Sequence, residues 1–178
     1  AYHRRQRQMC IRDRPMIILT CLASKLSNKQ VIWVEDRLEH LTAASSATGR
    51  LTKLRASINE KGLIEALDYD QIDDVGAYPR APEPASLYRM HGNLSGAYKV
   101  KNIRCRNRVV LTNKTPSGLN RGFGGPQHYF ALERLVHQIA VELNLNVLDV
   151  IKVNLLEKKQ FPYKSPSGAL LDLSLIHI

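Results

Sequence analysis

The chain has 178 residues, of which 44% are hydrophobic and 24% charged, and a formal net charge of +10 at pH 7. This is ordinary globular composition, sufficient for one domain or parts of two, and no apolar run approaches the roughly 20 residues that span a membrane. The three cysteines, Cys10, Cys21 and Cys105, lie too far apart to indicate a disulfide framework or a zinc site. Five arginines and one aspartate fall within residues 1–14, so the remainder is only mildly basic, which disfavours nucleic-acid binding.

The two ends of the chain have related coding sequences. Residues 9–14 and 173–178 can be encoded by one DNA string read from opposite strands, and that string resembles a transposon-type sequencing adapter. We therefore expect residues 1–14 and 173–178 to be adapter-derived and not to belong to the fold. The alternative is a basic arm and an apolar tail that belong to the protein.

The first part of the remaining chain predicts two helices around a short strand. Residues 16–26 form an uninterrupted apolar run, which favours a buried helix over a strand. Asn28 and Lys29 mark a turn, and the β-rich run 31–34 predicts a strand in which Trp33 is most simply a core residue. Residues 35–41 begin with acids, as a short helix often does.

The middle of the chain predicts β-structure. Residues 51–59 alternate imperfectly, and residues 63–72 resume a strand-like pattern after a Lys-Gly turn, so a hairpin is expected. Residues 77–84 contain three prolines and are predicted to be loop. Residues 85–96 can form a short helix, and residues 103–111 alternate with basic side chains as a strand does.

The last part predicts a loop and two helices. Residues 112–125 are polar and rich in glycine, Pro126 suits the first turn of a helix, and apolar residues then repeat at helical spacing as far as Leu143. Asn146 can cap a second helix over 147–155, and residues 161–172 are predicted to be loop. The whole pattern predicts an α+β fold with a mixed sheet, a hairpin and C-terminal helices.

The loop ahead of Pro126 is the strongest candidate site. Its glycines, Gly122, Gly124 and Gly125, permit positive φ and close approach of a ligand to the backbone. Their N–H groups lie ahead of a helix start, where a polar or anionic cofactor group can bind, and Phe123 is poised to pack against a flat group. A helix-capping loop with a buried phenylalanine fits these residues equally well.

The segment Asn120-Arg121-Gly122-Phe123-Gly124-Gly125-Pro126-Gln127 resembles the second cofactor loop of a known enzyme family. The family is that of the molybdopterin-binding catalytic (large) subunits of xanthine dehydrogenase, aldehyde oxidase and aerobic carbon monoxide dehydrogenase. Further matches follow in the same order, in the runs 33–40, 74–78, 87–92, 112–114 and 150–155. The resemblance implies an internal fragment, with a partial molybdopterin-binding domain over residues 15–172.

The resemblance also implies roles for particular residues. The cofactor-binding residues would be Arg121, Gly122, Phe123, Gly124 and Gly125, and the Phe123 ring would also pack on the substrate. Arg89 falls where xanthine-type members place a substrate-orienting arginine, and a guanidinium can stabilise negative charge that builds on the substrate. The alternative for Arg89 is a surface ion pair, for example with Glu83.

Other polar residues are not expected to be catalytic. The family's general-base glutamate lies downstream and its first glycine-rich loop upstream, so no catalytic residue and no direct metal ligand is expected here. Glu133 is expected to be structural, and the scattered histidines His91, His128 and His137 are expected to be solvated or at the edge of the core. Carbon monoxide dehydrogenases of the family carry a loop cysteine that residues 116–121 lack, which disfavours carbon monoxide oxidation.

The function that the resemblance implies is that of a molybdenum-dependent oxidoreductase, which hydroxylates an aldehyde or N-heterocycle with water-derived oxygen. The expected cofactor is molybdenum–molybdopterin in its cytosine dinucleotide form, with 2Fe-2S and FAD partner subunits or domains, in the cytoplasm. The fragment alone is expected to be inactive. A rival hypothesis is a basic nucleic-acid-binding module built on Arg104, Arg106 and Arg108. Residues 103–111, however, lack the interleaved aromatic residues that such a module needs. A third hypothesis is a purely structural interaction domain.

Overall fold

A three-stranded mixed sheet is the centre of the fold, seen in a computed structural model that describes residues 15–43, 47, 49–79, 89–118, 122 and 124–172. Strands β1 (Gly49–Ile58) and β2 (Ile64–Asp74) form an antiparallel hairpin, and β3 (Asn102–Val110) pairs with β2 in parallel, so β2 is central. The predicted hairpin, the strand at 103–111 and the mixed α+β character are therefore confirmed. The adapter predictions for residues 1–14 and 173–178 lie outside the described residues.

The β1–β2 turn is held by one asparagine. The Asn59 side-chain oxygen accepts hydrogen bonds from the N–H groups of Lys61 and Leu63, both at 3.0 Å. Gly62 adopts a φ of 76° in this turn. The alternation of side chains along β1 and β2 then decides which face of the hairpin is buried.

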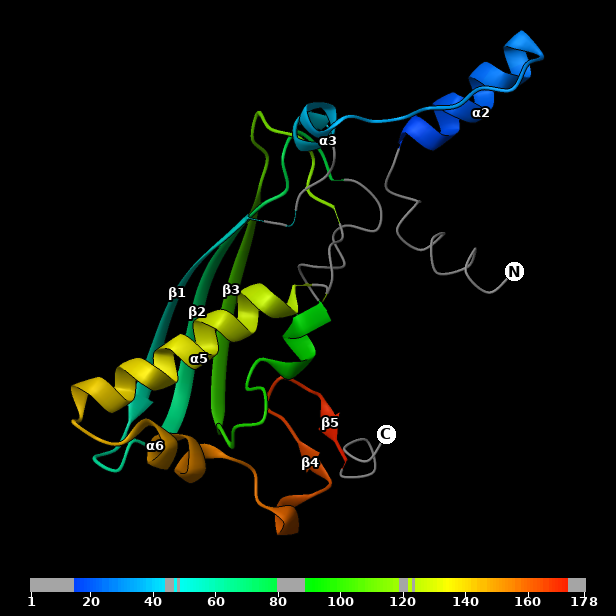
Figure 1. Cartoon of the computed structure of the whole chain (residues 1–178). Helices are drawn as coiled ribbons and strands as arrows, with labels where there is room; N and C mark the ends of the chain where they lie inside the picture. The colour runs from blue at the N-terminus through cyan, green and yellow to red at the C-terminus, as the bar shows by residue number, and fades with distance from the viewer. Residues whose placement is uncertain are drawn as a thin grey trace.

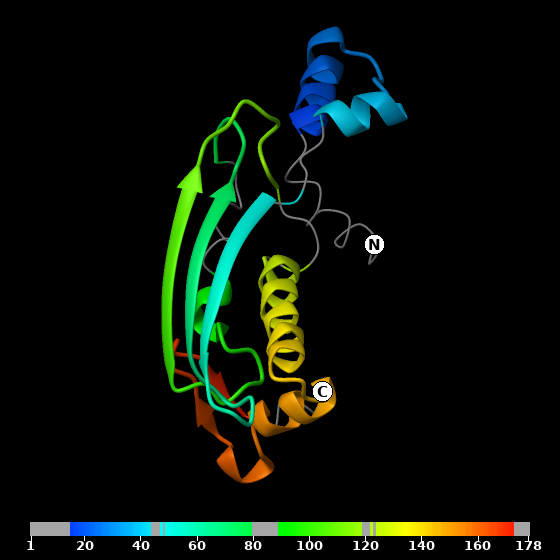
Figure 2. The ribbon, with the colours of Figure 1, turned by 90° about the vertical axis from the view of Figure 1, so that its left-hand side faces the viewer.

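Helix α5 (Gly125–Glu142) covers one face of the sheet, as Figures 1 and 2 show. Its apolar stripe packs on the inward residues of the sheet to form the core, which includes Leu67, Tyr69, Leu132, Val136 and Ile139. The predicted helical spacing is confirmed, except that Phe130 is exposed on the helix surface. The predicted loop before the helix and the place of Pro126 in its first turn are also confirmed where the loop is described.

The opposite face of the sheet carries a ladder of ion pairs. Asp68 on β2 binds Arg55 of β1 at 2.6 Å and Arg104 of β3 at 2.7 Å, and Arg108 binds Asp70 at 2.7 Å. Hydrogen bonding from Arg104, with Arg55 also contributing, lowers the pKa of Asp68 to about 2. Two of the three arginines in the nucleic-acid alternative are thus engaged by aspartates of the neighbouring strand.

Helix α6 (Val147–Asn154) closes the end of the core near the hairpin turn. Asn146 caps it as predicted, since its side chain accepts from the Leu148 N–H at 2.8 Å. The fully buried Asn154 ends the helix and accepts a hydrogen bond from the Ile64 N–H at 2.8 Å. Its amide nitrogen donates to the carbonyls of Gly62 and Val150, also at 2.8 Å, so one side chain joins α6 to the hairpin.

Two short 3-10 helices and a small hairpin complete the C-terminal half. The first, η1 (Arg89–Asn93), is shorter than the helix predicted over 85–96, of which residues 85–88 lie outside the described residues. The second, η2 (Lys158–Gln160), precedes strands β4 (Tyr163–Lys164) and β5 (Leu170–Leu171). The prediction of loop throughout 161–172 was wrong at these two strands, which are too short to carry an alternating pattern.

The N-terminal segment departs most from expectation. Helix α2 (Pro15–Ser27) forms as predicted but stands apart from the sheet in Figure 1, and Leu26 is 78% exposed, so its predicted burial was wrong. Helix α3 (Arg37–Ala43) follows an extended segment with no strand at 31–34, where Trp33 is 51% exposed. The reason is physical: an apolar run becomes a core element only where a partner surface covers it, and the described residues supply none here.

Candidate functional site

The predicted glycine loop leads directly into α5. Gly122 and Gly124 have positive φ values of 99° and 82°, and the Gly125 N–H donates to the Gly122 carbonyl at 2.8 Å. A Cβ on Gly122 would lie 2.8 Å from Cδ of Pro126, so the turn requires glycine at this position. Arg121, together with Phe123, lies outside the described residues.

The start of α5 forms a tight turn with the glycine loop. Its N-cap is Gly124, which has no side chain to cap the helix. The Gly125 N–H donates to the Gly122 carbonyl, the His128 N–H donates to the Gly124 carbonyl at 3.2 Å, and Pro126 has no N–H. The positive end of the helix dipole lies at this turn and favours a polar or anionic group beside it. That the loop binds a cofactor group stays a prediction.

The segment that carries Arg89 lies against this same helix start. The Arg89 backbone opens η1, while its side chain is outside what the structure describes. A Cβ on Gly125 would meet Sδ of Met90 at 3.7 Å, and Asn93 Nδ2 donates to the Tyr129 hydroxyl at 3.3 Å. The fold thus brings the predicted substrate segment beside the predicted cofactor loop.

A buried carbonyl links the two segments. The Leu94 carbonyl lies 2.8 Å from the Tyr69 hydroxyl, which donates to it, and 3.1 Å from Nε2 of His128. The Tyr69 and His128 rings stack with centroids 5.2 Å apart. Burial raises the pKa of Tyr69, while burial above all, with the nearby Arg50 and His91 adding to it, lowers that of His128 to about 4.

The prediction that His128 is solvated or at the edge of the core was wrong, because its side chain is fully buried. The missed signal was helical spacing: His128 is four residues before Leu132 and eight before Val136, on the same buried stripe. His137, in contrast, is exposed, and His91 is partly buried with a pKa lowered by burial and by Arg50. The described residues contain no group of three His, Cys, Asp or Glu side chains that could hold a metal ion.

Asp74 joins the end of β2 to the loop that leads to the glycines. Its carboxylate accepts from the Thr112 hydroxyl at 2.6 Å and the Gly76 N–H at 2.9 Å, and lies 2.7 Å from Lys114 Nζ. The hydrogen bonds from Lys114, Thr112 and Gly76, in that order, lower the pKa of Asp74 to about 2. The motifs 74–78 and 112–114, noted separately in the sequence, thus form one structural unit.

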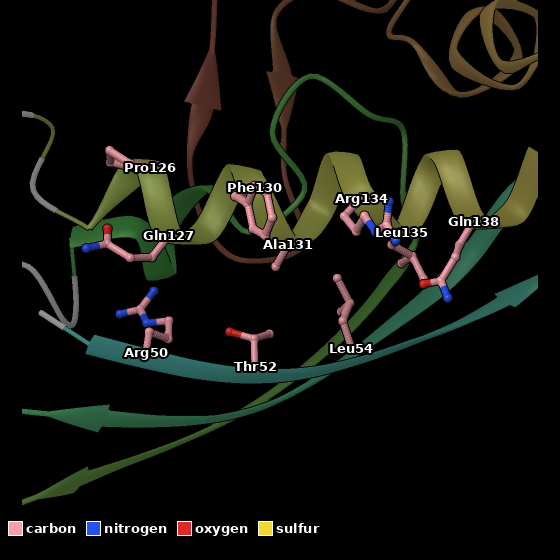
Figure 3. A pocket seen from close by; sticks show the side chains of 10 residues that line it. All are labelled: Arg50, Thr52, Leu54, Pro126, Gln127, Phe130, Ala131, Arg134, Leu135 and Gln138. Carbon is pink, nitrogen blue, oxygen red and sulfur yellow. The ribbon is translucent and has the colours of Figure 1, made fainter.

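A cleft of about 640 Å³ runs between β1 and α5 and begins beside the residues that follow the glycine loop. In Figure 3, Arg50, Thr52 and Leu54 point from β1 toward the helix. The Arg50 guanidinium binds both oxygens of Asp73, at 2.6 and 3.0 Å, and the two side chains are 3% and 0% exposed. The inner face of the sheet is therefore polar near the glycine loop and apolar toward α6.

The fully buried Gln71 continues this polar half. Neither its side-chain oxygen nor its nitrogen has a hydrogen-bond partner among the described residues. Buried amide atoms are usually satisfied by a protein group or an ordered water. Gln71 therefore adds two hydrogen-bonding atoms to the polar half of the inner face.

Glu133, for which a structural role is predicted, hydrogen-bonds to a residue of the core. Its carboxylate accepts from the Tyr98 hydroxyl at 2.8 Å, and burial together with this bond raises the pKa of Tyr98.

None of the described helices combines the length and the apolar character that a membrane crossing requires.

Comparisons with known proteins place most of the chain in one family. A family model described as the molybdopterin cofactor-binding domain matches residues 11–155. The gamma subunit of the 6-hydroxypseudooxynicotine dehydrogenase complex of Paenarthrobacter nicotinovorans is 30% identical over 149 residues, which are 84% of this chain and 19% of that protein. The carbon monoxide dehydrogenase large chain of Hydrogenophaga pseudoflava is 27% identical over 169 residues, 92% of this chain and 21% of that protein.

A comparison with solved structures supports the same family. The crystal structure of quinoline 2-oxidoreductase from Pseudomonas putida 86 superposes with a TM-score of 0.82 at 29% identity, over 89% of this chain and 20% of that one. The chain spans about a fifth of the length of these three relatives. The chain belongs to the family of molybdopterin cofactor-binding domains, as its glycine loop and flanking motifs predict.

Proposed function

We propose that this chain is part of the large subunit of a molybdenum hydroxylase, an enzyme that oxidises an aldehyde or an N-heterocycle with oxygen taken from water. The observation that carries the proposal is the glycine loop at the start of α5, held beside the segment that bears Arg89. The family match over residues 11–155 gives the loop its chemical meaning.

The residues present fit a molybdopterin cofactor. Gly122 and Gly124 have positive φ values, which residues with a side chain rarely adopt. The turn that they form lies directly before an 18-residue helix, at the positive end of its dipole. The cofactor-holding residues would be Arg121, Gly122, Phe123, Gly124 and Gly125. When bound, the molybdenum centre supplies the two-electron chemistry, while these residues bind and orient.

The substrate contacts proposed in this chain are Arg89 and Phe123. A guanidinium beside the reacting group stabilises negative charge on a ring nitrogen or a carbonyl oxygen, and an aromatic ring packs on a flat substrate. Relatives carry names such as nicotine 6-hydroxylase and quinoline 2-oxidoreductase, which favours an N-heterocycle. The absence of a cysteine from residues 116–121 argues against carbon monoxide.

The parent enzyme would use the cytosine dinucleotide form of the cofactor and pass electrons to 2Fe-2S and FAD-binding subunits or domains in the cytoplasm. Relatives named as a gamma subunit and a large chain support a multi-subunit complex. Residues 15–172 would be the protein's own part, and residues 1–14 and 173–178 adapter-derived. The fragment alone would be inactive, because it lacks the general base and the first cofactor loop.

The test compares two glycine variants in the parent subunit expressed with its partners. Gly122→Ala forces a Cβ at positive φ against Pro126, so we expect loss of molybdenum content and of substrate-dependent dye reduction. Gly168→Ala is the matched control, since Gly168 has a φ of 101° in the β4–β5 turn with no atom within 4 Å of the added Cβ. Full molybdenum content in G122A would contradict the proposed cofactor loop, and dye reduction by the 178-residue chain alone would refute its proposed inactivity.

A further inference from the structure

We propose that His128 is a positioning residue: through the Leu94 carbonyl it holds the segment that bears Arg89 against the glycine loop. This inference rests on the proposed function for the role of Arg89. The contact itself is independent of that role, because it joins two segments of the described fold.

The sequence positions make the contact effective. His128 is the third residue after Gly125, and Leu94 is the fifth after Arg89. One hydrogen bond, 3.1 Å long, therefore connects the two predicted site segments across 34 residues of chain. A displacement of this contact would move the Arg89 backbone relative to the glycines.

Several neighbours leave little freedom to the contact. The Tyr69 hydroxyl donates to the same carbonyl at 2.8 Å, from the centre of β2. A Cβ on Gly96 would meet the Leu132 side chain at 3.3 Å, so the chain after Leu94 passes close to α5. His128 is further enclosed by the ring of Tyr129, whose centroid lies 5.3 Å away at 71°.

The contact fixes the tautomer of His128. A carbonyl oxygen only accepts, so Nε2 must carry the hydrogen and donate it. Nδ1 is then unprotonated, and it has no hydrogen-bond partner among the described residues. A neutral Nε2–H ring is therefore the form that joins the segments, and the pKa lowered to about 4 by burial keeps this form at neutral pH.

A histidine suits this position because its side chain reaches the Leu94 carbonyl and directs its Nε2–H toward it. A buried carbonyl that loses a donor is costly, and Tyr69 approaches it from the sheet side. Among the described residues, His128 is the one whose side chain ties this carbonyl to the helix that follows the glycine loop. Productive orientation of a substrate is sensitive to displacements of about 1 Å, so such a tie can matter for turnover without touching the substrate.

The first experiment uses the 178-residue chain. Nitrogen-15 NMR should show His128 as the Nε2–H tautomer, and hydrogen exchange should report the Tyr98 N–H, which bonds the Ser95 carbonyl just after Leu94. His128→Leu should accelerate that exchange on the order of tenfold, whereas His128→Gln, whose Nε2 can still donate, should stay within about threefold of the parent. His137→Leu, on the exposed side of α5, is the matched control.

The second experiment uses the parent subunit in its complex. His128→Leu should lower kcat/KM on the order of tenfold at unchanged molybdenum content, and His128→Gln should restore most of it. If His128→Leu does not fold, Tyr69→Phe provides a second variant. It removes the other donor to the Leu94 carbonyl and should lower kcat/KM by a smaller factor at unchanged molybdenum content. An Nδ1–H tautomer, or equal effects of the Leu and Gln variants, would overturn the inference. A parent complex without molybdenum would instead overturn the proposed function. The NMR result would still test the contact between His128 and the Leu94 carbonyl.

Discussion

The buried ion pair of Arg50 and Asp73 gives the sharpest stability prediction. The guanidinium binds both carboxylate oxygens, and the two side chains are 3% and 0% exposed. Removing one partner leaves the other charge buried and uncompensated, which costs about 3–5 kcal/mol in comparable sites. Arg50→Met and Asp73→Leu should each lower the free energy of unfolding by about this amount.

The double variant should behave differently from either single one. With both charges gone, no desolvated charge remains, and apolar replacements of buried pairs are often neutral or stabilising by about 1–4 kcal/mol. R50M/D73L should therefore recover most of the stability lost in R50M. The exposed pair of Arg108 with Asp70 supplies the control, since Arg108→Met should cost about 1 kcal/mol or less.

Urea denaturation followed by circular dichroism at 222 nm measures these differences. Trp33 fluorescence would be a poor reporter, because this tryptophan is half exposed in the native state and lies in the segment between α2 and α3. A double variant as unstable as the sum of the single ones would show that the loss does not come from an uncompensated buried charge. An Arg50→Met cost no larger than that of Arg108→Met would show the same.

Three further predictions concern buried or bridging polar groups. Asn154→Leu leaves a buried N–H and a carbonyl of the hairpin unpaired and should cost about 2–5 kcal/mol in urea denaturation, while exposed Asn102→Leu should cost under about 0.5. The folded-state pKa of His128, about 4, lies below the unfolded value of 6.5. The contribution of neutral His128 to the free energy of unfolding is therefore complete above pH 6.5 and falls by about 3 kcal/mol as the pH drops toward 4. The stability difference between the parent and H128Q should change with pH in the same way, and a difference that does not change with pH would contradict this. The carboxyl carbon-13 shift of Asp74 should titrate near pH 2, and a midpoint near 4 would show that its contacts with the following loop do not form in solution.

Local patterns in the sequence were enough to predict the elements that support the site. The hairpin followed from alternation and a Lys-Gly turn, and α5 followed from helical spacing after Pro126. Asn146 was correct as a cap because capping depends on residues only two positions apart. The glycine loop was found because glycines at positive φ are a local requirement of the backbone.

The features that were missed depend on distant parts of the chain. No local signal sets the parallel register of β2 with β3, which pairs Gln71 with Asn107 and so defines the polar half of the inner face. The Leu94 carbonyl is a backbone group, so no side chain in the sequence marks it as the meeting point of two segments. Helix α2 shows the converse error, where composition predicted burial that only a partner surface can provide.

The candidate loop is anchored separately at both of its ends. Upstream, the Ser117 N–H donates to the Val75 carbonyl at 2.9 Å, and Asp74 holds Thr112 and Lys114. Downstream, α5 begins at Gly125 and is tied to the sheet through the core. The contacts of both anchors come from described residues on either side of 119–121, so we predict that substitutions at 119–121 change what the loop binds more than how stably the chain folds. Binding specificity in this fold can therefore vary along the loop while the two anchors keep its ends in register.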